Sequence, residues 1–326
     1  MRRRIVRAMT YSIVARDPAT GDLGVAVQTR WFAVGAGVAW VEPGVGAVAT
    51  QSFSEDAYGF HGLRLLREGR TAASALAELV AQDVDPEVRQ VGIVDASGAA
   101  AAHTGLRCVR FASHLVVPGV TVQANMMERP TVPAAMLATF LGTEGGLAVR
   151  LVAALRAAER EGGDVRGRQS AAIVVAPGTG RPGDGSGVGG AVPGGGERPQ
   201  PWARLVDLRV DDHPEPLDEL ARLLDLSGAY DEMDEAEQAI LRGDAAGAVS
   251  AGARSVALAH GDDQVVLWSA VGLALEGRID EARAALAAAA ASEPRAAEHL
   301  RRFHEAGHLP GGAATLRALG IEAPVR

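Results

Sequence analysis

The hydrophobic patterning of the sequence changes once along the chain, and this change divides it into two kinds of structure. From Thr10 to Ala176, strand-like and helix-like segments are mixed, whereas from Leu217 onward every segment has a helical pattern. Residues 178–201 separate the two parts and consist mostly of Gly and Pro, which predicts a flexible loop. We therefore expect one mixed domain over residues 9–213 and an all-helical domain over residues 214–326.

Strands and helices follow one another in groups within the first domain. Runs of β-forming residues between turn residues predict strands at Thr10–Arg16, Leu23–Arg30, Val34–Trp40, Val45–Gln51, Val88–Val94, Ala99–Thr104, His114–Val117, Thr121–Ala124, Ser170–Ala176 and Leu205–Val210. Helical spacing predicts Tyr58–Glu68, Thr71–Gln82, Val132–Leu141 and Leu147–Glu161, with Thr71 as an N-cap. Helices that arrive in pairs indicate a layered α+β domain with two sheets between helix layers, because a doubly wound fold alternates single strands and helices.

The helical part contains an internal repeat. Gly243 and Gly277 are 34 residues apart, and each lies between two segments of helical length. A helix-turn-helix period of this length with a small residue at the turn is typical of tetratricopeptide (TPR) repeats, and Trp268 and Pro294 fit the second unit. The helices expected here are Leu217–Leu226, Glu232–Arg242, Ala245–Ala259, Gln264–Glu276, Ile279–Ala291 and Glu293–Ala306.

Charge and composition exclude several classes of protein. The net charge of −8 argues against a general binder of nucleic acid or of anionic membranes. No stretch approaches the ~20 apolar residues of a membrane span, and the basic start up to Ala8 lacks the apolar region of a signal peptide. Cys108 is the only cysteine, so a disulfide within the chain is impossible and a reducing, cytoplasmic location is expected. All 32 basic residues are Arg, which removes Lys from every catalytic scheme.

Thr10, at the start of the first predicted strand, is the most informative candidate for chemistry. If translation starts at Met9, removal of that methionine leaves Thr10 with a free α-amino group, whose ordinary pKa is about 7.7–8.0. Such an amine can act as general base for the hydroxyl of its own residue. The alternative is that Thr10 is an ordinary β-branched strand residue behind an authentic extension. Ser12 lies two residues on, on the same strand face, and would need a separate base.

Polar residues at other strand ends are weaker candidates for binding. His103 follows an apolar strand and either points into a cleft or is a satisfied structural histidine. Gln123 and Asn125 end another strand, and an amide there could donate to a developing oxyanion or only fix a turn. Asp164, Arg166, Arg168, Gln169 and Ser170 crowd a junction between a helix and a strand. Arg168 could bind a substrate carboxylate, or an Asp–Arg pair could anchor the loop.

Several motifs in order resemble the DUF1028 family over about residues 9–225. They are TYSIVARDPATGDLGVAVQTR from Thr10, AAHTG at 101–105, QANMM at 123–127, GGDVRGRQSAAI at 162–173 and DLRVDDHPEP at 207–216. The resemblance implies the Ntn-hydrolase-like four-layer α-β-β-α sandwich and hydrolysis of an amide-type bond. The segments ILRGDAAGAV and LWSAVGLALEGRIDEA resemble a module often fused to this family and named for peptidoglycan binding.

The sequence departs from the better-known Ntn amidohydrolases in two ways. Those enzymes close the second strand with an acid and an arginine and use a lysine to tune the nucleophile. Here the strand ends with Gln28, Thr29 and Arg30, so the arginine fits and the acid is replaced by an amide. Either Arg30 or Arg168 tunes the amine, or the site has lost hydrolytic power and only binds.

The remaining motifs predict no metal and no cofactor. Asp211, Asp212 and His213 are more typical of a solvated strand end than of a metal site, and the Gly-rich loop lacks a phosphate-binding Lys. The repeats could hold a peptide or partner segment, and the acidic run over 231–237 would favour a basic partner. Our first hypothesis is an Ntn-type hydrolase of a small amide or peptide-like bond, and a homodimer is expected. The alternative is a non-catalytic scaffold that binds protein or cell wall through its repeats.

Overall fold

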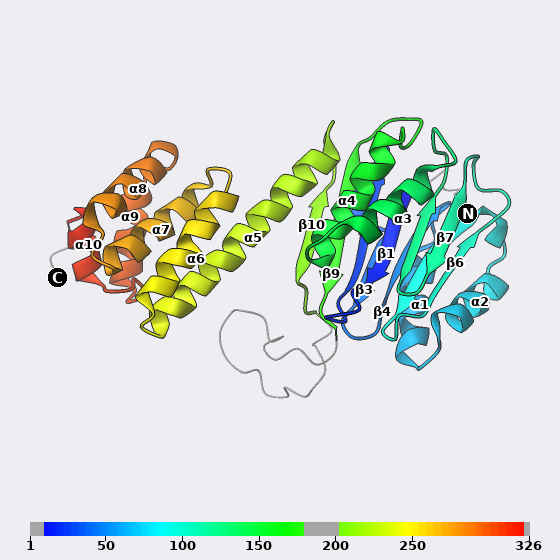
Figure 1. Cartoon of the computed structure of the whole chain (residues 1–326), viewed down its shortest axis with the longest axis horizontal. Coiled ribbons are helices and arrows are strands. Elements are labelled where there is room, and N and C mark those ends of the chain that lie inside the picture. Colours follow the sequence, from blue (N-terminus) through cyan, green and yellow to red (C-terminus); the bar gives the residue numbers. More distant parts are fainter. Residues whose placement is uncertain (1–9, 179–201, 323–326) are drawn as a thin grey trace. The chain divides into compact units, whose positions relative to one another are not determined.

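Two antiparallel sheets packed face to face make up the first part of the chain in a computed structural model, which describes residues 10–178 and 202–322 (Figure 1). The chain divides into two compact units that meet between Ala221 and Arg222, and each is described by itself below. In the described residues no helix is long and apolar enough to cross a membrane.

The larger sheet has six strands in the order β10-β9-β2-β1-β8-β7. Their bounds are β1 (Thr10–Arg16), β2 (Leu23–Thr29), β7 (Ser113–Val117), β8 (Val120–Ala124), β9 (Ser170–Ala176) and β10 (Val206–Val210). β1 and β2 form the expected hairpin, in which Thr10 lies opposite Thr29. Because β1 also pairs with β8, both of its edges are hydrogen-bonded and the strand is held in the middle of the sheet.

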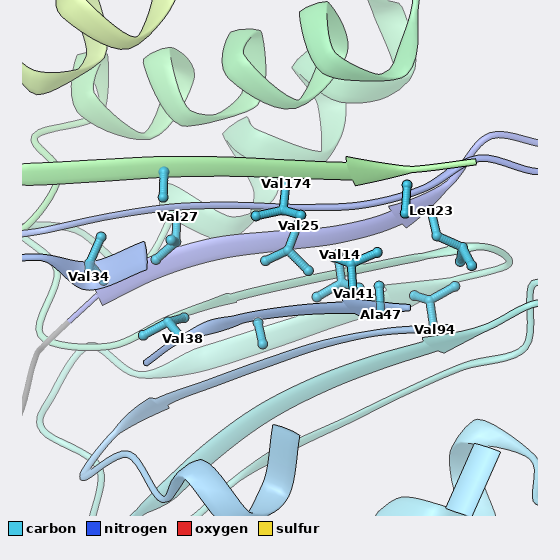
Figure 2. Packing of buried hydrophobic residues seen from close by; sticks show 13 residues of the cluster. Val14, Leu23, Val25, Val27, Val34, Val38, Val41, Ala47, Val94 and Val174 are labelled. Carbon is cyan, nitrogen blue, oxygen red and sulfur yellow. The ribbon is translucent and has the colours of Figure 1, made fainter. Parts of the chain in front are cut away.

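The smaller sheet has four strands in the order β3-β4-β5-β6. Their bounds are β3 (Ala39–Glu42), β4 (Gly46–Ser52), β5 (Arg89–Asp95) and β6 (Ala100–Thr104). Alternate residues of the two sheets meet in an apolar core that includes Val14, Val25, Val27 and Val94 (Figure 2). Valine and alanine fill this layer because the chain is poor in aromatic residues, at 4%.

Helices cover the outer face of each sheet. α1 (Asp56–Arg67) and α2 (Ala72–Gln82) pack on the four-stranded sheet, and α3 (Val132–Gly142) and α4 (Leu147–Arg160) pack on the six-stranded sheet. Thr71 caps α2, as predicted, because its side chain accepts a hydrogen bond from the Ser74 amide at 3.2 Å. The paired helices and antiparallel sheets confirm the mixed α+β class expected from the element order.

The strand predicted over Val34–Trp40 is wrong in its first half. A short 3₁₀ helix, η1 (Val34–Ala36), stands there, and extended backbone begins only at Ala39. Ala33 turns the chain with a φ of 55°, in the left-handed region. A Cβ on Gly35 would lie 2.7 Å from the Cβ of Ala172, so the backbone approaches β9 closely at that point.

The second unit is helical, as the pattern predicted. α5 (Pro216–Leu241) begins before the boundary between the units and continues into the second. The helices after it are α6 (Ala245–Leu258), α7 (Asp263–Leu275), α8 (Ile279–Ser292), α9 (Ala296–Glu305) and α10 (Ala313–Leu319). α5 is one continuous helix where two were expected. Ala229, between those two segments, is buried in one cluster with Ala259, and its carbonyl accepts a 2.6 Å bond from the Ser255 hydroxyl. α10 was not predicted. The Gly/Pro-rich loop predicted over 178–201 lies, after Gly178, outside the described residues.

Candidate functional site

The interface between the two sheets is apolar at one end and polar at the other. Alternate residues of a strand point to the same face, and Val14 lies in the core between the two sheets. Thr10, Ser12 and Val14 of β1 therefore all point toward the four-stranded sheet. From Val14 toward the start of β1, the side chains that point into the space between the sheets carry hydroxyl and amide groups. We call this layer the amide network and define it as Thr10, Ser12, Gln51, Gln90, Thr104, Gln123 and Asn125.

Thr10 lies fully buried at the start of the central strand. Its hydroxyl donates to the hydroxyl of Thr29 at 3.3 Å. Its carbonyl accepts three hydrogen bonds, from Gln51 Nε2 at 3.0 Å, from Asn125 Nδ2 at 3.3 Å and from the backbone amide of Asn125 at 3.1 Å. The first residue of β1 is therefore fixed in position by groups from three other strands or strand ends.

Ser12 joins the two sheets through a pair of amides. Its hydroxyl donates to Gln51 Oε1 at 2.6 Å and accepts from Gln123 Nε2 at 2.7 Å. Both partners are neutral amides, and neither can take up a proton at neutral pH. This geometry suits a structural link better than a second nucleophile.

Gln90 is the hub of the amide network. Its Oε1 accepts from Gln51 Nε2 and Asn125 Nδ2, both at 2.8 Å. Its Nε2 donates to Thr104 Oγ1 and to the Ala124 carbonyl, both at 2.9 Å. The sequence reasoning missed Gln51 and Gln90. The available signal was one glutamine near an end of each strand, on the face whose other residues are small or apolar.

Glycine leaves space for the network at one point of the facing sheet. A Cβ on Gly92 would lie 2.3 Å from Gln123 Oε1 and 2.4 Å from Thr121 Oγ1. Those two oxygens and Asn125 Oδ1 are buried and, within the described part of the chain, have no hydrogen-bond partner. Buried polar atoms without a partner cost free energy of desolvation, so these three oxygens lower the stability of the folded state.

The network ends at an imidazole. Thr104 Oγ1 and His114 Nδ1 lie 2.8 Å apart. Burial of His114, together with the nearby His103, lowers its pKa below the ordinary 6.5, so the ring is neutral at pH 7.

Gln28 and Tyr11 lie on the opposite face of the sheet, toward α4. The Tyr11 hydroxyl donates to Glu159 Oε2 at 2.6 Å, and burial first, then the Glu159 carboxylate, raise the pKa of Tyr11 well above 10. Gln28 pairs with Tyr11 across the hairpin and is fully buried, and neither end of its amide has a partner in the described residues. The structure thus separates Gln28 from the Thr10 hydroxyl.

The junction before β9 is held by ion pairs. Asp164 accepts from the Arg30 backbone amide at 3.3 Å and pairs with Arg166 at 2.7 Å. The exposed Arg30 side chain donates to Gln169 at 3.1 Å, and Arg168 pairs with Glu159 at 2.9 Å. The pair of Asp164 with Arg166 anchors this loop, which is the second of the two alternatives given above for the junction.

His103 and Ser170 also lie outside the amide network. His103 sits opposite Val91, on the helix-facing side of its sheet, with Nε2 2.9 Å from the Pro86 carbonyl. The Ser170 hydroxyl donates to the Trp31 carbonyl and accepts from the Val34 amide at 3.1 Å, so it fixes the turn before η1. Of the ten residues predicted for the site, the structure joins four: Thr10, Ser12, Gln123 and Asn125.

Residues 10–178 and 202–322 contain no group of three or more His, Cys, Asp or Glu side chains able to hold a metal ion. At the predicted solvated strand end, Asp212 accepts from Gln169 at 3.0 Å and His213 Nδ1 accepts from the Glu215 amide at 3.0 Å. Asp212 is therefore bonded to the segment before β9, and His213 to its own turn.

Fold and site together define an α+β protein of two facing antiparallel sheets with a buried amide network at one end of the central strand. The model of DUF1028, a family of unknown function, matches residues 10–220, and the chain belongs to this family. The crystal structure of protein SPO2555 from Silicibacter pomeroyi, which carries the same family model, is similar with a TM-score of 0.55 and 29% identity. The match covers 66% of this chain and 88% of that one. No curated protein matches the chain.

Proposed function

We propose that the first unit is an amide-bond hydrolase of the N-terminal-nucleophile class, with the four-layer sandwich of that class and Thr10 as its nucleophile. One observation carries the proposal: Thr10 begins the central strand, and its carbonyl is held by three N–H groups from Gln51 and Asn125. Preorganisation of this kind is what a nucleophile needs to meet a substrate carbonyl in a fixed geometry.

The base in this reaction is the α-amino group of Thr10 once the preceding residues are gone. The amine takes the proton from Oγ1 as that oxygen attacks the substrate carbonyl. The C–N bond then breaks, the departing amine receives the proton, and an ester on Thr10 remains. Water hydrolyses the ester to a carboxylic acid and restores the hydroxyl.

The surrounding groups divide between positioning and recognition. Ser12, Gln123 and Asn125 position the strand start through neutral hydrogen bonds. Arg30 follows Thr29, which lies opposite Thr10, and its exposed guanidinium can bind a carboxylate of the substrate. The side chains that bond to Thr10 are neutral, which suits the mechanism, because a cation in contact with the α-amine would disfavour its protonation.

The test is the hydrolysis of a panel of small linear and cyclic amides by protein translated from Met9. N-terminal sequencing and intact mass should show a chain that begins at Thr10. Thr10→Ala should abolish turnover, whereas Thr10→Ser should retain part of it, and both keep a small residue after Met9. Turnover that survives in Thr10→Ala, or a protein that retains its leading residues and is equally active, would refute the proposal.

A second candidate function has its own supporting observation. Thr10 is fully buried, and it lines neither the cleft of about 500 Å³ beside β9 and β10 nor the one of about 200 Å³ at the turn between β1 and β2. A binding or scaffold protein of the same fold would have this property. Inactivity across the amide panel in protein proved to begin at Thr10 would favour that function.

For the helical region we propose TPR-like repeats that bind a basic protein segment. Gly243 and Gly277, the repeated turn residues, both have a positive φ, 74° and 79°. Burial, and for Asp231 also the neighbouring carboxylates, raise the pKa values of Asp231 and Asp234. A basic partner would relieve that repulsion. Asp231→Asn with Asp234→Asn in the full chain should weaken capture of an Arg-rich peptide.

A further inference from the structure

The two sheets differ in width, and the difference leaves part of one inner face uncovered. The six-stranded sheet ends at β10, where Asp207 and Arg209 lie opposite Val174 and Ala172 of β9 and therefore share their inward face. Both are nonetheless exposed, whereas Val174 and Ala172 are buried in the core. The inner face of β10 thus opens to solvent.

A cleft of about 500 Å³ occupies this place. Its floor is the inner face of β9 and β10, and its walls are η1, the edge strand β3 and helix α1. The volume falls within the range of about 300–1,000 Å³ that is usual for sites of small organic ligands.

Four guanidinium groups line the cleft: those of Arg64, Arg67, Arg204 and Arg209. The lining contains two carboxylates, Glu42 and Asp207, and a third, Glu68 just outside the lining, pairs with Arg64 at 3.2 Å. Four guanidiniums therefore stand beside three carboxylates here, in a chain whose net charge is −8. The two lining carboxylates hold two of the guanidiniums in place, because Arg67 pairs with Glu42 and Arg209 pairs with Asp207. A fixed guanidinium loses less entropy when it binds an anion.

Aromatic surface lies beside these cations. Phe60 of α1 is 61% exposed and lines the cleft together with Trp40 of β3. The Trp40 ring lies against Gly59, where a Cβ would come within 2.3 Å of it, and its Nε1 donates to the Gly37 carbonyl at 3.1 Å. The indole is thus fixed in orientation, and an exposed phenyl ring lines the same cleft.

We propose that this cleft binds an amphipathic organic anion, a carboxylate or phosphate carried on a flat apolar body. The guanidiniums would bind the charged group, and Trp40 and Phe60 would contact the body. Neither a purely apolar ligand nor a simple inorganic anion would use both features. The site is independent of Thr10 and would exist in a catalytic protein and in a non-catalytic one.

Equilibrium dialysis of the full chain with 2-naphthoate tests the proposal, with 2-naphthyl phosphate, 2-naphthylmethanol and inorganic phosphate as comparison ligands. We expect saturable binding of one or both naphthyl anions, at least tenfold tighter than that of the neutral alcohol or of phosphate. The two anions distinguish a carboxylate ligand from a phosphate ligand. Absence of saturable binding of both would overturn the proposal.

Three variants locate the binding. Arg64→Gln with Arg209→Gln should weaken binding of the naphthyl anion about tenfold, and Ala36→Trp should block it, since exposed Ala36 lines the cleft and bears no charge. Arg160→Gln, on an exposed arginine outside the cleft, should bind as the unaltered protein does. Binding that survives Ala36→Trp, or that falls equally in Arg160→Gln, would place the ligand elsewhere and refute the assignment.

Discussion

Replacement of Gln90 by leucine removes the hub of the amide network at nearly constant volume. Gln90 is fully buried and makes hydrogen bonds through both ends of its amide. In the variant, Asn125 Nδ2 would keep only its 3.3 Å contact with the Thr10 carbonyl, and the Ser113 and Ala124 carbonyls would lose a donor. At about 1–3 kcal/mol for each buried group left unsatisfied, the free energy of unfolding should fall by about 3–6 kcal/mol.

This loss is a large part of the roughly 5–15 kcal/mol that stabilises an ordinary domain. Urea unfolding followed by circular dichroism measures the decrease in the free energy of unfolding. Hydrogen exchange of peptides over 89–95 measures the same decrease for the first unit alone. Gln82→Leu is the matched control, because Gln82 is exposed and bonds only to Glu78 at 3.4 Å. A Gln90→Leu variant that loses less than about 1 kcal/mol, like the control, would refute the claim that the network is desolvated.

Three further predictions follow from local geometry. Gly92→Ala should lower the free energy of unfolding by about 1–3 kcal/mol in urea titrations, because the new methyl meets Gln123 Oε1 at 2.3 Å; an unchanged value would contradict this. Gly59→Ala should lower the melting temperature because its Cβ meets an indole ring, whereas Gly272→Ala, with open space around it in α7, should gain up to about 1 kcal/mol; the opposite order would contradict the packing. Because the folded-state pKa of His114 is lowered, the neutral ring stabilises the folded state fully above pH 6.5, and this stabilisation is lost as the pH falls below that value. An NMR titration that gives His114 a pKa above 6.5 would contradict this prediction.

Much of the fold could be predicted because local pattern determines it. The strand Ser170–Ala176 is a continuous apolar run, and the structure has it with the same bounds. The residues after Val34 also have a strand-like pattern, yet they form η1, since Gly35 packs against Ala172 from a strand more than 130 residues away. Close approach between distant segments leaves no periodic signal in the sequence.

The sequence predicts which residues of the candidate site share a face within one strand, but not which strands lie next to one another. Alternation places Thr10 and Ser12 on one face of β1, and that inference needs no tertiary information. Gln51 and Gln90 become neighbours through the pairing of β4 with β5, and only the stacking of the two sheets brings them to Thr10 and Asn125. Gln28 shows the converse limit, because it shares a strand with Thr29 but faces the helices.

Covalent labelling of Thr10 tests the central claim most directly. Protein that begins at Thr10 is treated with a β-lactone, whose ring opens to an ester on an activated hydroxyl, and is then digested with trypsin. Cleavage after Arg16 gives the N-terminal peptide TYSIVAR, in which fragmentation distinguishes Thr10 from Ser12. We predict a stoichiometric ester on Thr10 that is absent from Thr10→Ala and from protein that retains residues 1–9. An unlabelled Thr10, or equal labelling with those residues retained, would contradict the account.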